Sequence, residues 1–212
     1  MASAVNVDKW AAGPAYGPVL PRTELYILKP ELQLHPILTR QHPSFSLVFN
    51  LLVGQPAGFN ADDAERDHPF LQANEPATLP RVQEIIIITD QSPWCTMVKN
   101  EQGVTLGDVF GSLWKEFECR GVRYTDNAVA DHELAACPPR MQDVIKRAAT
   151  SNQQASNPGW GFYSPSAQVR IRRVDWLREK TYFEIMLKDD NYSLNRLGLI
   201  APDVFLMKLT AY

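Results

Sequence analysis

The hydrophobic pattern changes from strand-like to helix-like between residues 84 and 121. Ile85–Ile88 is a β-branched run, which is typical of a strand buried on both faces. Ser92-Pro93 interrupts this run, and Trp94–Val98 resumes it as a second strand. Asn100–Gly103 has the composition of a tight turn. The stretch therefore predicts two strands that are separated by a break and followed by a turn.

A helix is predicted over Thr105–Arg120, directly after this turn. Thr105 stands at the N-cap position with Asp108 three residues later, which is the spacing of a capping box. Gly121 is a natural C′ residue at the other end. The apolar residues of the segment fall on one helical face: Leu106, Val109, Phe110, Leu113 and Phe117.

The rest of the chain contains weaker signals of the same kinds. Arg140–Ala149 follows a Pro-Pro pair and predicts a second helix. Gly54–Pro80 is acidic and turn-rich, which indicates a long surface loop. Leu25–Leu38 contains two prolines and is expected to hold only short extended pieces. Further strands are expected at Phe45–Val53, Gln168–Val174, Tyr182–Leu187 and Val204–Leu209.

Together these elements predict an α+β fold, with a mainly antiparallel sheet and two helices packed on one of its faces. Residues 1–30 begin with a segment rich in glycine and proline and are expected to form an irregular N-terminal arm. Residues 31–212 show neither an internal repeat nor a clear linker, so we expect a single α+β domain there.

Composition narrows the classes of function. The chain is 45% hydrophobic and 21% charged, as in ordinary globular proteins. Its net charge of −3 disfavours a nucleic-acid partner. The sequence lacks both a secretory signal pattern and an apolar run of the roughly 20 residues that a membrane helix needs. We therefore expect a cytoplasmic protein without a membrane partner.

Assembled catalytic or metal-binding motifs are missing from the sequence. The four histidines are scattered, and the three cysteines have no C-x-x-C spacing, so neither a metal nor another cofactor is expected. Cys95 lies on the second strand and is expected to be a buried free thiol that behaves as a small hydrophobe.

A candidate ligand site lies in the second half of the chain. Its arginines suit a bidentate anion such as a carboxylate or phosphate, and the aromatic loop before them suits stacking. The candidate residues are Trp160, Phe162, Tyr163, Arg170, Arg172, Arg173 and Asp175. The alternative is structural: Arg172 or Arg173 pairs with Asp175 to fix the end of the strand, and Trp160 or Phe162 packs on the core.

Four short elements resemble an uncharacterised family, a domain of unknown function that is abundant in mushroom-forming fungi. They are Glu75-Pro76-Ala77-Thr78-x-Pro80, Trp94-x-x-x-Val98-x-Asn100, Gly103-Val104-Thr105-Leu106-x-Asp108-Val109 and Arg173-Val174-Asp175-Trp176-Leu177. The resemblance covers roughly Leu32 to the C-terminus. It implies a fungal source and a single α+β domain, and it implies no activity.

Two functions remain open at this point. The first is a binding or interaction module whose ligand is a small anionic or aromatic molecule or a protein. The alternative is a small-molecule enzyme of the isomerase, cyclase or hydrolase type, with acid–base groups assembled from distant segments. Its candidate groups are Asp175, His132, Arg173 and Tyr182. Convergence of two titratable groups in an enclosed pocket would favour the enzyme.

Overall fold

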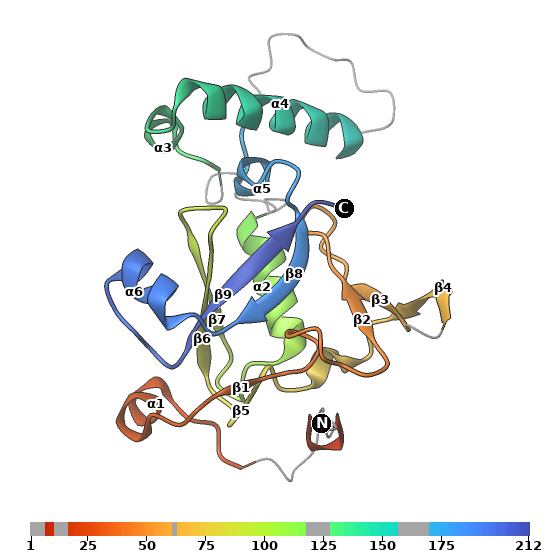
Figure 1. Ribbon diagram of the computed structural model, residues 1–212, viewed down its shortest axis with the longest axis vertical. Helices are drawn as coiled ribbons and strands as arrows, with labels where there is room; N and C mark the ends of the chain where they lie inside the picture. The colour runs from red at the N-terminus through yellow and green to blue at the C-terminus, as the bar shows by residue number, and fades with distance from the viewer. Residues whose placement is uncertain (1–6, 11–16, 61–62, 118–127, 157–169) are drawn as a thin grey trace.

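The fold is α+β, as the sequence predicts, and centres on a four-stranded sheet (Figure 1). The computed structural model describes residues 7–10, 17–60, 63–117, 128–156 and 170–212. The sheet has the order β7-β6-β9-β8. Its strands are β6 (Glu84–Thr89), β7 (Cys95–Lys99), β8 (Tyr182–Leu187) and β9 (Val204–Thr210). β6 and β9 run parallel, and the other two pairs are antiparallel, so the mainly antiparallel prediction is confirmed.

Helices cover the two faces of this sheet. Helix α2 (Leu106–Phe117) packs on the face that carries Ile85, Ile87 and Phe205. Helix α6 (Asp190–Leu197) lies on the opposite face, where Tyr192 packs against a cluster that includes Ile88 and Leu206. β6 is consequently buried on both faces along most of its length, as its β-branched run predicts.

Helix α4 differs from its prediction in position. The predicted helix is present and longer, at Pro139–Ser156. Its main neighbour is α5 (Arg173–Trp176), and Figure 1 shows it beyond one end of the sheet. Only α2 of the two predicted helices therefore packs on the main sheet. The reason is that α4 buries a narrow stripe, with Ile145 and Ala149 inaccessible, against a short helix instead of against a sheet.

The region predicted as a surface loop contains three strands, β3, β4 and β5, which belong to two small sheets. β2 (Ser46–Val48), β3 (Ala57–Asn60) and β4 (Asp63–Pro69) form one of them. β1 (Gln33–Leu34) and β5 (Thr78–Leu79) form the other. The short η2 helix spans Gln72–Asn74. The loop prediction for Gly54–Pro80 is thus wrong, because these short strands gain stability from pairing partners that local sequence does not reveal.

The expected strand at Phe45–Val53 is shorter than predicted. β2 ends at Val48, and the Asn50 side-chain oxygen accepts a hydrogen bond from the backbone N–H of Leu52 at 2.9 Å. This local bond turns the chain, as asparagine side chains commonly do.

The N-terminal region contains more regular structure than expected. η1 (Val7–Trp10) and α1 (Arg22–Leu28) lie where the sequence suggested an irregular arm and extended pieces. Trp10 is 1% exposed, so it anchors η1 to the protein body. Leu25 is the buried residue of α1 and anchors that helix to the protein body.

The predicted strand at Gln168–Val174 is wrong within its described residues, 170–174. Arg172 makes only an isolated bridge with Ala128, and α5 starts at Arg173. Asp175 explains the helical turn, because its carboxylate accepts a hydrogen bond from the backbone N–H of Arg172 at 2.8 Å. A second short helix, α3 (Asp131–Ala135), precedes α4.

The capping box of α2 is present as predicted. The Thr105 hydroxyl accepts a hydrogen bond from the Asp108 backbone N–H at 3.2 Å, and the Asp108 carboxylate accepts one from the Thr105 N–H at 2.9 Å. All five residues of the predicted apolar stripe are buried. Phe110 contacts the rings of Phe49 and Phe183, with centroids 4.9 and 5.7 Å away.

We predict opposite effects of two substitutions in α2. Thr105→Ala removes the cap and should lower the free energy of unfolding by about 1 kcal/mol. Gly111→Ala should raise it by about 0.5–1 kcal/mol, because alanine is the better helix former and an added Cβ there meets open space. Urea denaturation measures both, and equal stability of the two variants would contradict the described start of α2.

Candidate functional site

The largest of the described hollows is a groove between the N-terminal segment and the β1–β5 sheet. It has a volume of about 640 Å³, which falls within the range of small-molecule sites. Its lining comes mainly from three segments: residues 17–20, called the first wall here, residues 28–33, called the second wall, and residues 79–81 at the end of β5, called the floor. The lining residues are Lys9, Gly17, Pro18, Leu20, Leu28, Pro30, Glu31, Gln33, Leu79, Pro80 and Arg81.

Backbone and side-chain hydrogen bonds hold the first wall. The Leu20 N–H donates to the Arg81 carbonyl at 2.9 Å, and the Gln83 N–H donates to the Leu20 carbonyl at 3.1 Å. The Arg81 guanidinium donates to the carbonyls of Gly17 at 2.9 Å and Gln102 at 3.4 Å. Both acceptors are backbone carbonyls, and these two bonds position the guanidinium beside the groove.

Lys9 is positioned at the second wall by η1. Its ammonium donates to the Gln33 side-chain oxygen at 2.8 Å and lies 5.3 Å from the ring centre of Trp10. Trp10 in turn packs edge-on against the ring of His35, 4.8 Å away. The groove wall is therefore supported by a buried contact between aromatic rings.

His35 is held by hydrogen bonds to both ring nitrogens. Nδ1 accepts the backbone N–H of Ile37 at 3.1 Å, so in the neutral ring Nε2 carries the proton. Nε2 then donates to the Glu75 carboxylate, 2.8 Å away. The side chain of His35 is 0% exposed. The pair thus links β1 to the segment that leads into β5.

Burial shifts the pKa values of both partners. Desolvation, with a smaller contribution from the nearby His42, lowers the pKa of His35 to about 3. Desolvation raises the pKa of Glu75. His35 is therefore neutral near pH 7 and acts as a hydrogen-bond donor. Because the His35 side chain is fully buried, its ring lacks the direct contact with a substrate that an acid–base catalyst makes.

The lining residues of the groove carry more positive than negative charge. Lys9 and Arg81 contribute two positive charges, and Glu31 contributes one negative charge, so the lining carries a net charge of +1. The whole chain carries −3. The lining residues are thus net positive, whereas the chain as a whole is acidic.

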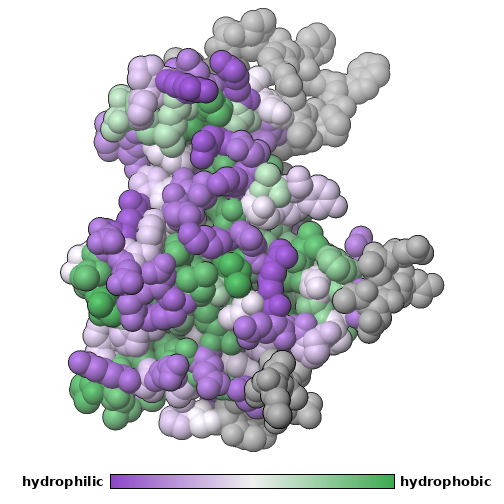
Figure 2. Space-filling view, in the orientation of Figure 1, coloured by the Kyte–Doolittle hydropathy of each residue, from purple (hydrophilic) through white to green (hydrophobic). Residues whose placement is uncertain are grey.

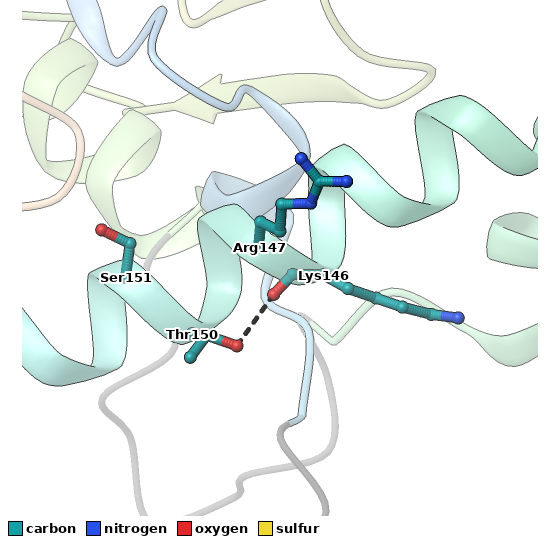
Figure 3. Close-up of a pocket in the computed structure, with 4 residues that line it drawn as sticks. All are labelled: Lys146, Arg147, Thr150 and Ser151. Carbon is teal, nitrogen blue, oxygen red and sulfur yellow. Dashed lines mark hydrogen bonds between the residues drawn. The ribbon is translucent and has the colours of Figure 1, made fainter.

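Two other hollows are each lined by residues of a single helix. One, of about 360 Å³, lies on α4 and is lined by Lys146, Arg147, Thr150 and Ser151. Figure 3 shows the Lys146 and Arg147 side chains pointing in different directions, while the Thr150 hydroxyl bonds the Lys146 carbonyl at 3.0 Å. The other, on α1, is lined by four residues of that helix, including Arg22 and Tyr26. Neither hollow brings groups from several elements together.

The structure places the predicted arginines in separate contacts. Arg172 pairs with Asp175 at 3.0 Å, as the structural alternative anticipated, and Asp175 also accepts a bond from Asn152. Arg173 pairs with Glu116 and lies 4.9 Å from the Trp94 ring centre. Burial lowers the pKa of Arg173. These bonds join α5 to α2 and α4.

Of the remaining residues of that predicted site, the structure describes only Arg170. Trp160, Phe162 and Tyr163 lie outside the described residues. Arg170 is exposed, and its backbone carbonyl accepts a hydrogen bond from Gln153 at 3.4 Å. A ligand site made by the aromatic loop and the arginines therefore stays a prediction.

The candidate enzyme groups do not share one of the three hollows described. Asp175 is 0% exposed, and His132 is exposed on α3. Tyr182 lies on β8 and stacks on Tyr212, 4.9 Å away. Within the described ranges, no group of three His, Cys, Asp or Glu side chains could hold a metal ion. In the same ranges, none of the helices is sufficiently long and apolar to cross a bilayer.

Sequence reasoning missed Lys9, His35, Glu75 and Arg81. Glu75 belongs to one of the short elements quoted above, but no spacing connects it to His35, 40 residues earlier. Lys9-Trp10 gives a local hint, a cation beside an aromatic residue. One prediction also needs correction: Cys95 is exposed, because the alternation of β7 turns it away from the α2 face.

We predict that stability falls on acidification between about pH 6.5 and pH 5. The pKa of His35 is about 3 in the folded chain and ordinary once unfolded, so the unfolded state binds more protons in this window. The raised pKa of Glu75 acts in the opposite direction. His35→Gln should therefore flatten the dependence of unfolding free energy on pH.

The control for that experiment is His132→Asn, since His132 is exposed on α3. It should leave the slope unchanged. Equal slopes for wild type and His35→Gln, measured by denaturation at several pH values, would show that His35 does not drive the pH dependence.

Comparison with known proteins places the chain in a family. Curated proteins and solved structures give no match to it. A family model matches residues 39–193, well over half of the chain, and this range contains all four elements that carried the resemblance. The chain belongs to DUF6699, a family of unknown function.

Proposed function

We propose that this protein is a binding module and that the β1–β5 groove takes a ligand with an apolar body and one carboxylate. The observation that carries the proposal is the composition of the groove, a mainly apolar trough with two cationic side chains beside it. Ligand sites typically combine an apolar lining with a few placed polar groups.

The apolar part of the groove comes from both walls and the floor. Leu20 is buried at the first wall, Leu28 is 63% exposed at the second, and Leu79 and Pro80 belong to the floor. A bound hydrocarbon or aromatic body would remove the exposed surface of Leu28 from water. Such burial contributes on the order of 25 cal/mol per Å².

The charged part favours a monoanion. Lys9 contacts a neutral amide oxygen, which a ligand carboxylate can replace with a stronger charge-assisted bond. The net charge of +1 around the groove matches one carboxylate, whereas a phosphate dianion would exceed it and meet Glu31. Arg81 is the second cationic residue of the lining.

Binding accounts for these features better than catalysis does. His35, the histidine of the His–carboxylate pair, is fully buried, and its ring packs against Trp10 of η1. The isomerase, cyclase or hydrolase alternative needs convergent titratable groups with access to a substrate. A cytoplasmic location, a protein partner and a fungal source stay predictions.

We predict that 4-phenylbutyrate binds the groove and that its neutral amide binds much more weakly. Lys9→Gln should lower the affinity for the carboxylate by roughly tenfold, which corresponds to the loss of one charge-assisted hydrogen bond. It should leave the affinity for the amide unchanged. Lys146→Gln, on the exposed surface of α4, is the matched control and should change neither ligand. Titration by NMR measures all of these affinities.

Three results would contradict this assignment. They are equal binding of the acid and amide, an equal effect of Lys146→Gln, or chemical-shift changes that avoid residues 17–33 and 79–81. Each would move the ligand away from the groove or remove the charge from its recognition.

A further inference from the structure

One edge of the main sheet is closed, and the other is open as far as the described residues go. At the β8 edge, the Phe183 N–H donates to the Phe49 carbonyl at 2.9 Å and the Met186 N–H donates to the Leu38 carbonyl at 2.8 Å. The opposite edge is β7, the last strand in the order β7-β6-β9-β8. No backbone hydrogen bond from the described residues reaches the outer side of Cys95–Lys99.

The register of β6 shows which β7 groups point outward. The Ile86 N–H donates to the Asp203 carbonyl, so Ile86 faces β9 and its neighbours Ile85 and Ile87 face β7. Ile85 is opposite Val98, and Ile87 is opposite Thr96. The backbone groups of Cys95, Met97 and Lys99 therefore point to the open edge.

The same three residues have exposed side chains. Met97 is 57% exposed, the Lys99 side chain is 63% exposed, and Cys95 is exposed. An edge strand that is protected against pairing commonly carries proline, a bulge or several charges. β7 has a regular register and one charge, on Lys99, which forms an ion pair with Glu84 of the same chain at 3.0 Å.

We propose that β7 pairs with β7 of a second copy, antiparallel and centred on Met97, so that the sheet continues across a two-fold dimer. This inference is independent of the proposed groove ligand. The edge is self-complementary in this register, as an isologous interface requires. The outward residues meet outward residues: Met97 lies opposite Met97 of the other copy, and Cys95 lies opposite Lys99.

In this register, the outward backbone N–H and C=O groups of all three residues in each strand find hydrogen-bond partners. Each of the three opposed pairs exchanges two backbone hydrogen bonds, for about six in all. Two exposed methionines bury one another at the centre. The lysines of the two copies lie at opposite ends of the paired strands, so like charges are not placed face to face. A second copy therefore fits the edge in hydrogen bonding, apolar contact and charge.

The first test is oligomeric state. Sedimentation of the full chain should show a reversible monomer–dimer equilibrium at concentrations up to about 200 µM. Met97→Pro should abolish it, because proline removes an outward N–H while the β6–β7 hydrogen bonds remain. Met97→Leu, which keeps both the N–H and the apolar contact, should still dimerise. If Met97→Pro fails to fold, Met97→Lys supplies the same test through repulsion at the centre.

The second test determines the register in which the two β7 strands pair. Lys99→Cys should form a disulfide between position 99 and Cys95 of the other copy under mild oxidation, because directly opposed strand residues lie within disulfide range. The matched control is the same substitution combined with Cys95→Ser, which should not cross-link at this edge.

The proposal is overturned by a chain that stays monomeric across this range, which would leave the edge to a strand of another protein. It is equally overturned if dimers persist in the Met97→Pro variant, or in Met97→Lys where that replaces it. Cross-linking of Lys99→Cys that is absent, or equal with and without Cys95, also overturns it.

Discussion

The burial of β6 on both faces is the constraint on which the rest of this structure depends. Ile85 and Ile87 face α2, whereas Ile88 faces the cluster beneath α6. One apolar strand therefore requires two layers of helix, which come from the middle and the end of the chain. It also requires a strand on each side, and the parallel partner β9 is supplied by the last residues of the protein.

Buried polar groups then hold the irregular segments around that sheet. Asp175 is fully buried and accepts hydrogen bonds from Arg172 and Asn152, which ties α5 to α4. Asp203, also fully buried, accepts the Tyr26 hydroxyl at 3.0 Å and so holds α1 near the start of β9. The His35–Glu75 bond does the same for the β1–β5 region. Each buried carboxylate has a partner from a distant segment, as the cost of desolvating a charge demands.

The two proposed binding surfaces are consequences of the same architecture. The groove lies where the chain approaches β6 through β5, so its walls can only be N-terminal residues that arrive from outside the main sheet. The open β7 edge exists because β9 takes the other side of β6. Figure 2 shows the surface of one face as a mixture of polar and apolar residues, with apolar area at α1. There, Ile27 and Leu28 are 73% and 63% exposed.

Local sequence determined the elements whose stabilising contacts are close in the chain. The α2 cap joins Thr105 and Asp108, its apolar stripe repeats every three or four residues, and β6 and β7 are joined by a short break. For these parts, propensity, capping and periodicity agree, which is why they were predicted correctly. The same holds for β8, which has its expected bounds, and for β9, which extends one residue beyond them.

Tertiary structure decided everything that depends on partners far apart in sequence. Gln168–Val174 has a strand-like pattern, but a buried Asp175 caps a helical turn there. Cysteine is a residue type that is usually buried, yet strand alternation and the position of β7 at the sheet edge expose Cys95. The groove needs Lys9, Leu28 and Arg81 together, and no periodicity relates them. Long-range contacts of this kind are set by packing of the whole chain, so local sequence could determine the strands and helices but not the site between them.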